Sequence, residues 1–308
     1  MTRALAFAAG ALALHVALSL LFVATICRDH DVRRMDARWL LGPRPAQVMV
    51  AGDSHPRLAV EAPVLGAAIN VAVPGEHYEK TTFRVPWLLD HGTRPVETVL
   101  LPFDAASFAA FKDDVFEPEA VWGRYVDWAE LGARKHRRWD FAQRALKASL
   151  APYVGEWPTV LQYLTASRHF RDPGEAQGVA NLVHIEGGVE VARRHFQGAD
   201  PWNDDMVWAF RRLLDDLRGR GIRVVLVRYP VSRAYFFEAQ RLGVDVAKRD
   251  ALLAEVGAPG VVDHLDFERA LFRTPDLFAD GDHLNPAGKR QFSRILAERL
   301  RALGVLHP

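Results

Sequence analysis

Cysteine is nearly absent from this chain of 308 residues, in which Cys27 is the only one. A single thiol excludes an intramolecular disulfide bond, a cysteine-rich zinc site and an iron–sulfur cluster. A charge excess of either sign is absent too, because 39 Lys and Arg residues stand against 38 Asp and Glu residues. We therefore expect no nucleic-acid partner, and the short basic run at residues 134–138 is typical of a solvated helix face.

Charged residues are missing from Ala4 to Cys27, where His15 is the one markedly polar interruption of an apolar run. A hydrocarbon core needs about 20 helical residues, so the run predicts a transmembrane signal anchor over residues 1–27. It is long for a cleaved signal peptide, whose apolar region has about 7–15 residues, and Ile26 is bulky for a lipoprotein cleavage site. A buried core helix is the remaining alternative.

The flanks of this run do not decide its orientation, because Arg3 lies on one side and Arg28, Arg33 and Arg34 lie on the other. Positive charge on both sides gives no clear inside end. A chain with one cysteine suits an oxidising compartment. We expect a single-pass protein of the cell inner membrane whose body, residues 45–305, lies in the periplasm.

Short apolar runs alternate with helical periodicity along this body. Such alternation predicts an α/β fold with right-handed crossovers and a parallel sheet. The expected strands are 46–51, 68–73, 96–101, 222–227 and 260–265, and the clearest helices are 76–89, 205–220 and 286–303.

Residues 104–204 interrupt the alternation. About a hundred residues between two strands are too many for a plain crossover, so we expect an inserted helical cap over the carboxyl ends of the strands, where such sheets bind ligands. Five of the eight tryptophans lie in this stretch, and they either pack in the cap's core or stack on sugar rings; they are Trp122, Trp128, Trp139, Trp157 and Trp202.

Two short motifs carry the chemistry. Gly52-Asp53-Ser54-His55 follows the first expected strand, and the glycine lets the chain turn sharply so that the Ser54 hydroxyl projects at the top of the sheet. Near the other end of the chain, Asp280-Gly281-Asp282-His283 precedes the last helix. A serine hydroxyl becomes a nucleophile when a histidine accepts its proton and a carboxylate orients that histidine.

The spacing favours Asp280 as that carboxylate. Asp280 lies three residues before His283 and can curl back to its far ring nitrogen, whereas Asp282 is adjacent and its side chain should diverge. We expect Ser54 to be the nucleophile, His283 the base and Asp280 its partner. The same segment is also typical of an Asx-rich turn that caps the last helix through Asn285.

Gly52-Asp53-Ser54 and Asp280-x-x-His283 resemble the first and last blocks of the SGNH/GDSL hydrolase superfamily, and Gly75 resembles the glycine of its second block. The histidine after the serine, the anchor and the Asp-His-Leu-Asn-Pro-x-Gly tail at 282–288 are similar to a bacterial branch of membrane-anchored O-acyltransferases. That branch includes the alginate O-acetyltransferase proteins and the D-alanyl transfer protein of teichoic acid synthesis. The resemblance spans 45–305 without the cap.

This resemblance implies a flavodoxin-like three-layer α/β/α sandwich with a Ser54–His283–Asp280 triad. It also implies that the backbone N–H groups of Ser54 and Gly75 form the oxyanion hole. One block is missing, because the superfamily usually places an Asn after the third strand and this chain has Asp104 there. A carboxylate cannot donate to an oxyanion, and loss of one donor costs other serine enzymes ~2.7–4 kcal/mol. Weak ester hydrolysis, and hence acyl transfer, is expected.

Further candidates are His77 and Arg228, which we place in substrate binding because each follows a strand at the expected active edge. The alternatives are a surface or capping role for His77 and a structural salt bridge for Arg228. No zinc motif and no phosphate-binding glycine loop occurs in the sequence, so we expect neither a metal ion nor another cofactor.

The sequence thus predicts an extracytoplasmic serine O-acyltransferase, with O-acetyl as the expected group, that acts on a cell-envelope polysaccharide or other glycan through acyl-Ser54. The alternatives are an esterase or deacetylase and a catalytically silent glycan-binding or assembly protein. Because activated acyl donors such as acyl-CoA are cytosolic, the resemblance also implies a multi-spanning membrane O-acyltransferase as partner. The small residues of 4–13 and the polar His15 would allow a helix–helix contact with it.

Overall fold

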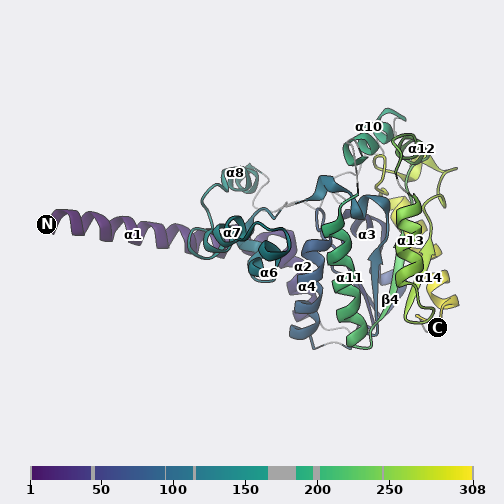
Figure 1. Ribbon diagram of the computed structural model, residues 1–308, viewed down its shortest axis with the longest axis horizontal. Helices are drawn as coiled ribbons and strands as arrows, with labels where there is room; N and C mark the ends of the chain where they lie inside the picture. The colour runs from purple at the N-terminus through teal and green to yellow at the C-terminus, as the bar shows by residue number, and fades with distance from the viewer. Residues whose placement is uncertain are drawn as a thin grey trace. The chain divides into compact units, whose positions relative to one another are not determined.

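The computed structural model describes residues 2–42, 46–93, 95–113, 116–165, 185–196, 202–244 and 246–306. The chain forms two compact units (Figure 1). The first comprises residues 1–37 and 115–172, and the second comprises residues 38–114 and 173–308.

A parallel sheet organises the second unit. Its five strands are β1 (Val48–Val50), β2 (Ala68–Asn70), β3 (Thr98–Pro102), β4 (Arg223–Arg228) and β5 (Val262–Asp266), in the order β2-β1-β3-β4-β5. Every neighbouring pair is parallel. The expected α/β class and parallel sheet are therefore confirmed, and each strand lies at its expected place.

Helices cover both faces of the sheet because successive strand residues point to opposite sides. One face buries Met49, Leu101 and Leu226 against α4 (Tyr78–His91), α11 (Asp204–Gly219) and α13 (Val246–Val256). The other face buries Val50, Leu100 and Val225 against α3 (Ser54–Ala59) and α14 (Pro286–Ala302). Figure 1 shows α4 and α11 side by side.

Shorter elements complete this unit. They are the helices α10 (Ile185–Phe196) and α12 (Arg233–Arg241) and the 3₁₀ turns η2 (Ala62–Leu65), η3 (Ala105–Phe108), η4 (Ala110–Lys112) and η5 (Pro275–Leu277). Helices α10 and α12 pack on each other. Together with the loop after β3 they bury a small apolar cluster around Phe196, Val231 and Tyr235.

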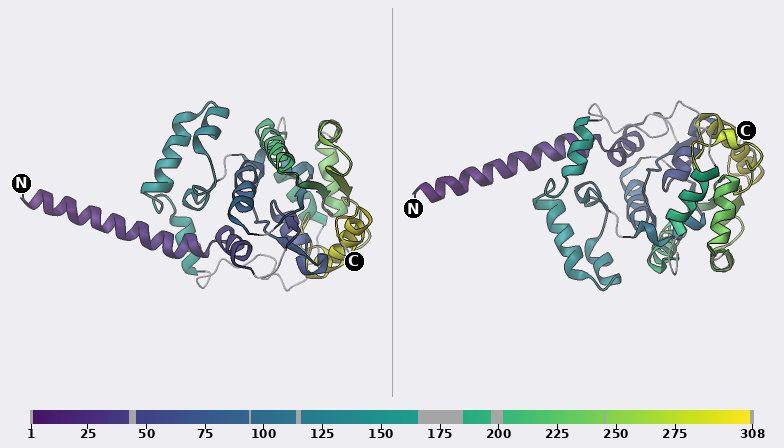
Figure 2. Two further views of the ribbon diagram at one scale, coloured as in Figure 1. Left: turned by 90° about the horizontal axis from the view of Figure 1, so that it is seen from below. Right: turned by 90° about the horizontal axis from the view of Figure 1, so that it is seen from above.

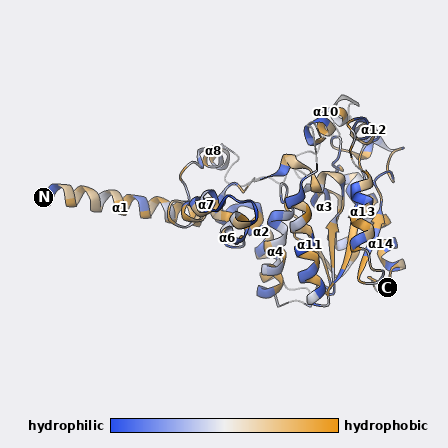
Figure 3. Cartoon of the chain, in the orientation of Figure 1, coloured by the Kyte–Doolittle hydropathy of each residue, from blue (hydrophilic) through white to orange (hydrophobic). Residues whose placement is uncertain are grey.

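The first unit begins with one long helix, which both views in Figure 2 show as an extended rod. This helix comprises α1 (Thr2–Phe22) and the π-helical turn η1 (Val23–Cys27). The unit also contains α5 (Glu119–Trp122), α6 (Trp128–Arg134), α7 (Arg138–Leu150) and α8 (Trp157–Thr165), and α2 (Asp31–Leu41) crosses the boundary between the two units after Ala37. The helix Thr2–Cys27 is long and apolar enough to cross a membrane. Figure 3 draws most of it in the colours of the hydrophobic end of the scale. Such a helix is either a membrane anchor or a signal sequence.

The cap expected over residues 104–204 is divided between the two units. Helices α5–α8 belong with α1, whereas α10 belongs with the sheet. Residues 166–184 and 197–201 of the expected cap lie outside the described residues. The length of the interruption indicated an insertion, but length alone does not show which core each helix joins.

The five tryptophans of this stretch separate into two groups. Trp122 and Trp128 are buried, and Trp202 stacks on Phe108 with ring centroids 5.1 Å apart. Trp139 and Trp157 are 74% and 67% exposed. Core packing therefore accounts for three of the five.

Candidate active site

The turn after β1 places Ser54 at the carboxyl edge of the sheet. Gly52 has φ +118°, and a Cβ on it would lie 2.6 Å from Cδ of Pro102, so both the conformation and the space require glycine. Asp53 caps α3 by accepting the backbone N–H of His55 at 3.0 Å. Ser54 is thus the first residue of a helix whose start is fixed by the glycine turn before it and by the Asp53 cap.

Three side chains from the two sequence motifs form one hydrogen-bonded chain. Ser54 Oγ lies 2.8 Å from Nε2 of His283, and Nδ1 of His283 lies 2.8 Å from Oδ2 of Asp280. Asp280 Oδ1 accepts the backbone N–H groups of Asp282 and His283 at 3.0 and 2.9 Å. Oδ1 of Asp282 is farther from the same ring nitrogen, at 3.4 Å. The geometry has the order that nucleophilic serine catalysis requires.

The turn that holds His283 also caps the last helix. Asn285 accepts the backbone N–H groups of Ala287 and Gly288 at the start of α14, as the alternative interpretation of this segment expected. A Cβ on Gly281 would lie 2.7 Å from Cα of Gly188 in α10, so only glycine lets the turn and the helix approach this closely. Helix capping and the triad geometry coexist in one segment.

A second histidine, which the sequence analysis did not place in the site, lies beside the triad. His55 is 4% exposed, with Nδ1 2.8 Å from Oδ2 of Asp104 and Nε2 3.0 Å from Oδ2 of Asp282. Asp104 also accepts the backbone N–H of Tyr229 at 2.8 Å. The Asp104 carboxylate, which replaces the expected Asn, therefore accepts hydrogen bonds from His55 and from the Tyr229 backbone N–H just after β4.

The two histidines are both shifted toward the protonated form. Burial disfavours the charged ring of His55, but Asp104 and Asp282 outweigh burial and raise its pKa well above the ordinary value. Burial also opposes charge on His283, and Asp282 and Asp280 together raise its pKa. Although burial disfavours the Asp282 carboxylate, the nearby His283 and His55 hold its pKa well below the ordinary range. The position of His55 between two carboxylates thus favours the protonated ring.

A third histidine, also missed from the sequence, comes from α10. His195 Nδ1 lies 2.9 Å from Oη of Tyr235 and 3.7 Å from Oδ2 of Asp282. Its ring stacks on Phe111 with centroids 4.3 Å apart. Burial lowers the pKa of His195 to about 4, which leaves the ring neutral near pH 7. No motif in the sequence pointed to it, because α10 follows the expected strands at no fixed spacing.

The remaining predicted site residues have different surroundings. Gly75 has φ +74° in the loop after β2, which lies beside the Ser54 turn because Val73 N–H donates to the Gly52 carbonyl at 2.9 Å. His77 is buried before α4, with Nδ1 3.7 Å from a carboxylate oxygen of Glu79. It lines a small pocket together with Gly52, Asp53 and Lys112, and substrate binding by His77 stays a prediction.

Arg228 is buried at the end of β4. It pairs with Asp266 at 2.6 Å and with Asp250 at 2.9 Å. These contacts correspond to the salt bridge that was the alternative to substrate binding. The two carboxylates neutralise the guanidinium, and substrate binding by Arg228 stays a prediction.

One group of side chains has metal-ligand geometry. The candidate ligand atoms of His55, Asp282 and His283 lie within 4.8 Å of one another. However, both ring nitrogens of each histidine already face a carboxylate or the Ser54 hydroxyl. A metal ion would have to displace those partners, so this donor set fits a proton-carrying network better than a metal centre.

Comparison with known proteins identifies no family. No family model matches the sequence, and no curated protein matches it significantly. One similar solved structure is that of a provisionally named platelet activating factor from Streptococcus pneumonia. It is 11% identical, with a TM-score of 0.42 over 92% of this chain and 98% of that chain. At these values the likeness supports no statement about chemistry.

Proposed function

We propose that this chain is a membrane-anchored serine O-acyltransferase of the SGNH/GDSL type that acetylates a cell-envelope polysaccharide or other glycan. The observation that carries the proposal is the unbroken chain of 2.8 Å contacts from Ser54 through His283 to Asp280. These three residues come from opposite ends of the sequence and meet at the strand edge where parallel sheets place their sites.

The chemistry runs in two steps. His283 Nε2 accepts the Ser54 proton while Oγ attacks the acyl carbonyl, and the leaving group departs with that proton to leave acyl-Ser54. His283 then accepts a proton from a sugar hydroxyl, whose oxygen attacks the acyl carbon and restores Ser54 with its proton. Asp280 holds the Nδ1 proton and stabilises the imidazolium in both steps.

Stabilisation of the oxyanion is assigned to two backbone groups. The Ser54 N–H lies in the first turn of α3, and the Gly75 N–H belongs to the neighbouring loop. Asp104 contributes no donor, because its carboxylate accepts hydrogen bonds from His55 and from the Tyr229 backbone. With a weakened oxyanion hole, the enzyme should react poorly with free esters in water. It should react better with an acyl donor or acceptor that a partner or a binding site holds in position.

The wider setting belongs to the same proposal. The strand order β2-β1-β3-β4-β5 is that of flavodoxin-like sheets, so we assign a flavodoxin-like three-layer sandwich. We further place residues 1–27 as an anchor in the cell inner membrane, with the catalytic body in the periplasm. A multi-spanning membrane O-acyltransferase would supply the acyl group from the cytosolic pool.

An esterase or deacetylase is the second candidate. The side chains of His283 and Asp280 are 22% and 40% exposed, so water has access to the base. The two candidates share acyl-Ser54 and differ only in the acceptor that resolves it.

Intact-mass analysis after a pulse of p-nitrophenyl acetate tests the proposal. The full-length protein should retain one acetyl group, and Ser54→Ala should retain none. Ser107→Ala is the control, because Ser107 is a serine of the same unit that follows β3 outside the triad. Addition of a glycan oligosaccharide should then move the acetyl group to sugar. Release to water alone would favour the esterase, and the absence of any adduct would leave a binding or assembly protein.

A further inference from the structure

The α7–α8 hairpin, residues 138–165, presents large apolar side chains on its surface. These side chains are far more exposed than those that cover the sheet of the second unit. They are Trp139 (74%), Leu146 (60%), Leu150 (61%), Val154 (49%), Trp157 (67%), Leu161 (47%) and Leu164 (63%). Positions 139, 146 and 150 share one face of α7, and positions 157, 161 and 164 share one face of α8, by helical spacing. Exposed apolar faces of this size mark a surface that another apolar phase covers.

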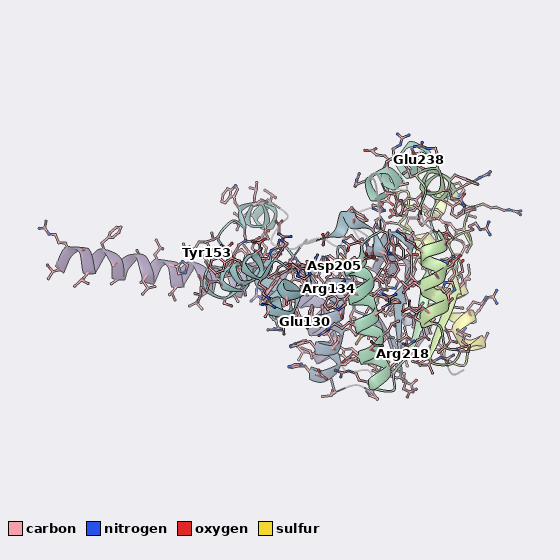
Figure 4. All side chains as sticks on the ribbon, viewed as in Figure 1. Glu130, Arg134, Tyr153, Asp205, Arg218 and Glu238 are labelled. Carbon is pink, nitrogen blue, oxygen red and sulfur yellow. The ribbon has the colours of Figure 1, made fainter. Side chains whose placement is uncertain are left out.

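The hairpin is hydrogen-bonded to the middle of the long apolar helix. His15 Nδ1 lies 2.9 Å from Oη of Tyr153, and His15 Nε2 lies 2.7 Å from the carbonyl oxygen of Leu150. Figure 4 labels Tyr153 beside α1. The partner expected for His15 is therefore a segment of its own chain.

The rest of the α1 contact continues along one helix face. His15, Ser19, Phe22 and Ile26 are the partly or fully buried positions on this face, spaced at helical intervals. Residues 2–14 are all exposed. Only the second half of the apolar helix is therefore packed against the other helices of the first unit.

The position of His15 along α1 fixes the depth of the hairpin if this helix spans a membrane. A span that starts at Ala4 and needs about 20 residues ends near Val23. His15 lies eight residues before Val23, which places it about 12 Å inside the hydrocarbon boundary at 1.5 Å per residue. The turn at 150–153, bonded to His15, must then lie below the membrane surface too.

The chemistry of the hairpin suits that depth. His15 satisfies the Leu150 carbonyl and the Tyr153 hydroxyl, which would otherwise be costly in lipid. Residues 138–165 contain three Lys or Arg and two Asp or Glu residues, and the basic run at residues 134–138 overlaps their start. Basic residues beside a membrane segment attract anionic headgroups. Trp139 and Trp157 are of the type that gathers at membrane interfaces.

An apolar groove of about 790 Å³ opens between α6 and α7. Its lining includes Trp128, Ala142, Leu146 and Leu150, so it shares side chains with the exposed face of the hairpin. A groove continuous with the face gives acyl chains a place to pack.

We propose that residues 138–165 form a second membrane contact, a hairpin that enters the same leaflet as the second half of α1. The occupant of its apolar face is an anionic lipid bilayer. This inference rests on the anchor that is part of the proposed function, and it does not depend on the chemistry at Ser54.

Depth-dependent fluorescence quenching in the full-length protein tests this contact. In a Cys27→Ala background, a bimane label is attached at Leu161→Cys in α8, at Leu12→Cys in α1, or at Asp215→Cys in α11. Leu12 is the reference for the anchor, and the Asp215 side chain, which is 78% exposed, is the aqueous reference. Liposomes of phosphatidylethanolamine and phosphatidylglycerol carry doxyl-labelled lipids, and each variant must unfold at the parent temperature.

Quenching at Leu161 comparable to that at Leu12, with none at Asp215, is the expected result. Quenching at Leu12 without quenching at Leu161 would overturn the hairpin and leave the anchor intact. No quenching at Leu12 would overturn both. The acetyl adduct on Ser54, measured on the same variants, reports the proposed chemistry separately.

Photo-crosslinking in native membranes distinguishes lipid from a protein occupant. A benzophenone amino acid at position 161 should give lipid adducts, and a discrete crosslinked protein would contradict a bilayer-covered face. Trp157, placed on the same face, is the second labelling site if substitution at Leu161 impairs folding.

Discussion

Two hydrogen-bonded chains lie at the carboxyl edge of the sheet, and each has a histidine at its centre. In Ser54–His283–Asp280 the ring is partly exposed and one partner is a hydroxyl. In Asp104–His55–Asp282 the ring is buried and both partners are carboxylates. Because both nitrogens of His55 face carboxylates and only His283 faces a hydroxyl, we assign proton transfer with Ser54 to His283. His55 instead holds three strand-end loops together.

Replacement of the two histidines should separate these roles most strongly. His283→Gln should slow formation of acyl-Ser54 by about 10⁴-fold or more, because the general base is lost. His55→Gln should slow it far less, since both ring nitrogens of His55 are hydrogen-bonded to carboxylates and not to the Ser54 hydroxyl. Stopped-flow release of p-nitrophenol measures both. Equal losses in two folded variants would remove the distinction between the chains.

The two carboxylates near His283 should differ in the same way. Asp280→Asn should lower turnover by about 10⁴-fold, as loss of an orienting carboxylate does in other serine enzymes. Asp282→Asn should have a smaller effect, because Asp282 Oδ1 lies 3.4 Å from Nδ1 and its other oxygen serves His55. Steady-state kinetics with unchanged circular dichroism decide the point, and the reverse ranking would show that the triad carboxylate is Asp282.

The sheet and each half of the triad were predictable because their signals are local, and the resemblance to a known family joined the two halves across the 229 positions between Ser54 and His283. Buried parallel strands appear as short apolar runs, and both the Gly-Asp-Ser turn and the Asp-x-x-His spacing lie within single segments. The Asp104–His55–Asp282 chain joins residues 49 and 227 positions apart, so it depends on which strand ends are neighbours. The ion pairs of Arg228 and the division of residues 104–204 likewise depend on packing between distant segments.

The free energy of unfolding should depend on the buried Asp104–His55–Asp282 chain. His55→Gln should lower the free energy of unfolding by about 3–5 kcal/mol, because it leaves two buried carboxylates without their cation. His283→Gln, at a more exposed ring, should lower it less. Urea unfolding measures both values. A double variant with Asp104→Asn should recover part of the loss, and a mild His55→Gln would argue against a buried ion pair.

The stability difference between wild type and His55→Gln should depend on pH in a defined direction. The folded-state pKa of His55 is raised well above its ordinary value, so its contribution is complete below the unfolded pKa of about 6.5. The contribution is lost as pH rises through the folded pKa. Wild type and His55→Gln should therefore converge in stability at alkaline pH. A gap that widens with rising pH would contradict the assigned imidazolium.

The pH profile of acyl-Ser54 formation should also shift, but by less than stability does. His283 accepts a proton only when neutral, and its raised pKa places the acid limb of acyl-Ser54 formation above pH 6.5. Asp282→Asn removes a negative charge from the surroundings of the ring, so the limb should move to lower pH. Rate measurements from pH 5 to about 9 test this direction, and a limb that moves upward would show that Asp282 does not act on His283.

Peptide mapping of the acetylated wild-type protein tests whether Ser54 is the nucleophile. After a brief p-nitrophenyl acetate pulse at neutral pH and rapid acid quench, we expect one acetyl group on the peptide that contains Ser54. Addition of the glycan acceptor before the quench should remove it. An acetyl group on another residue with Ser54 unmodified, or a Ser54 adduct that forms equally fast in His283→Gln, would rule out the proposed Ser54–His283 chemistry.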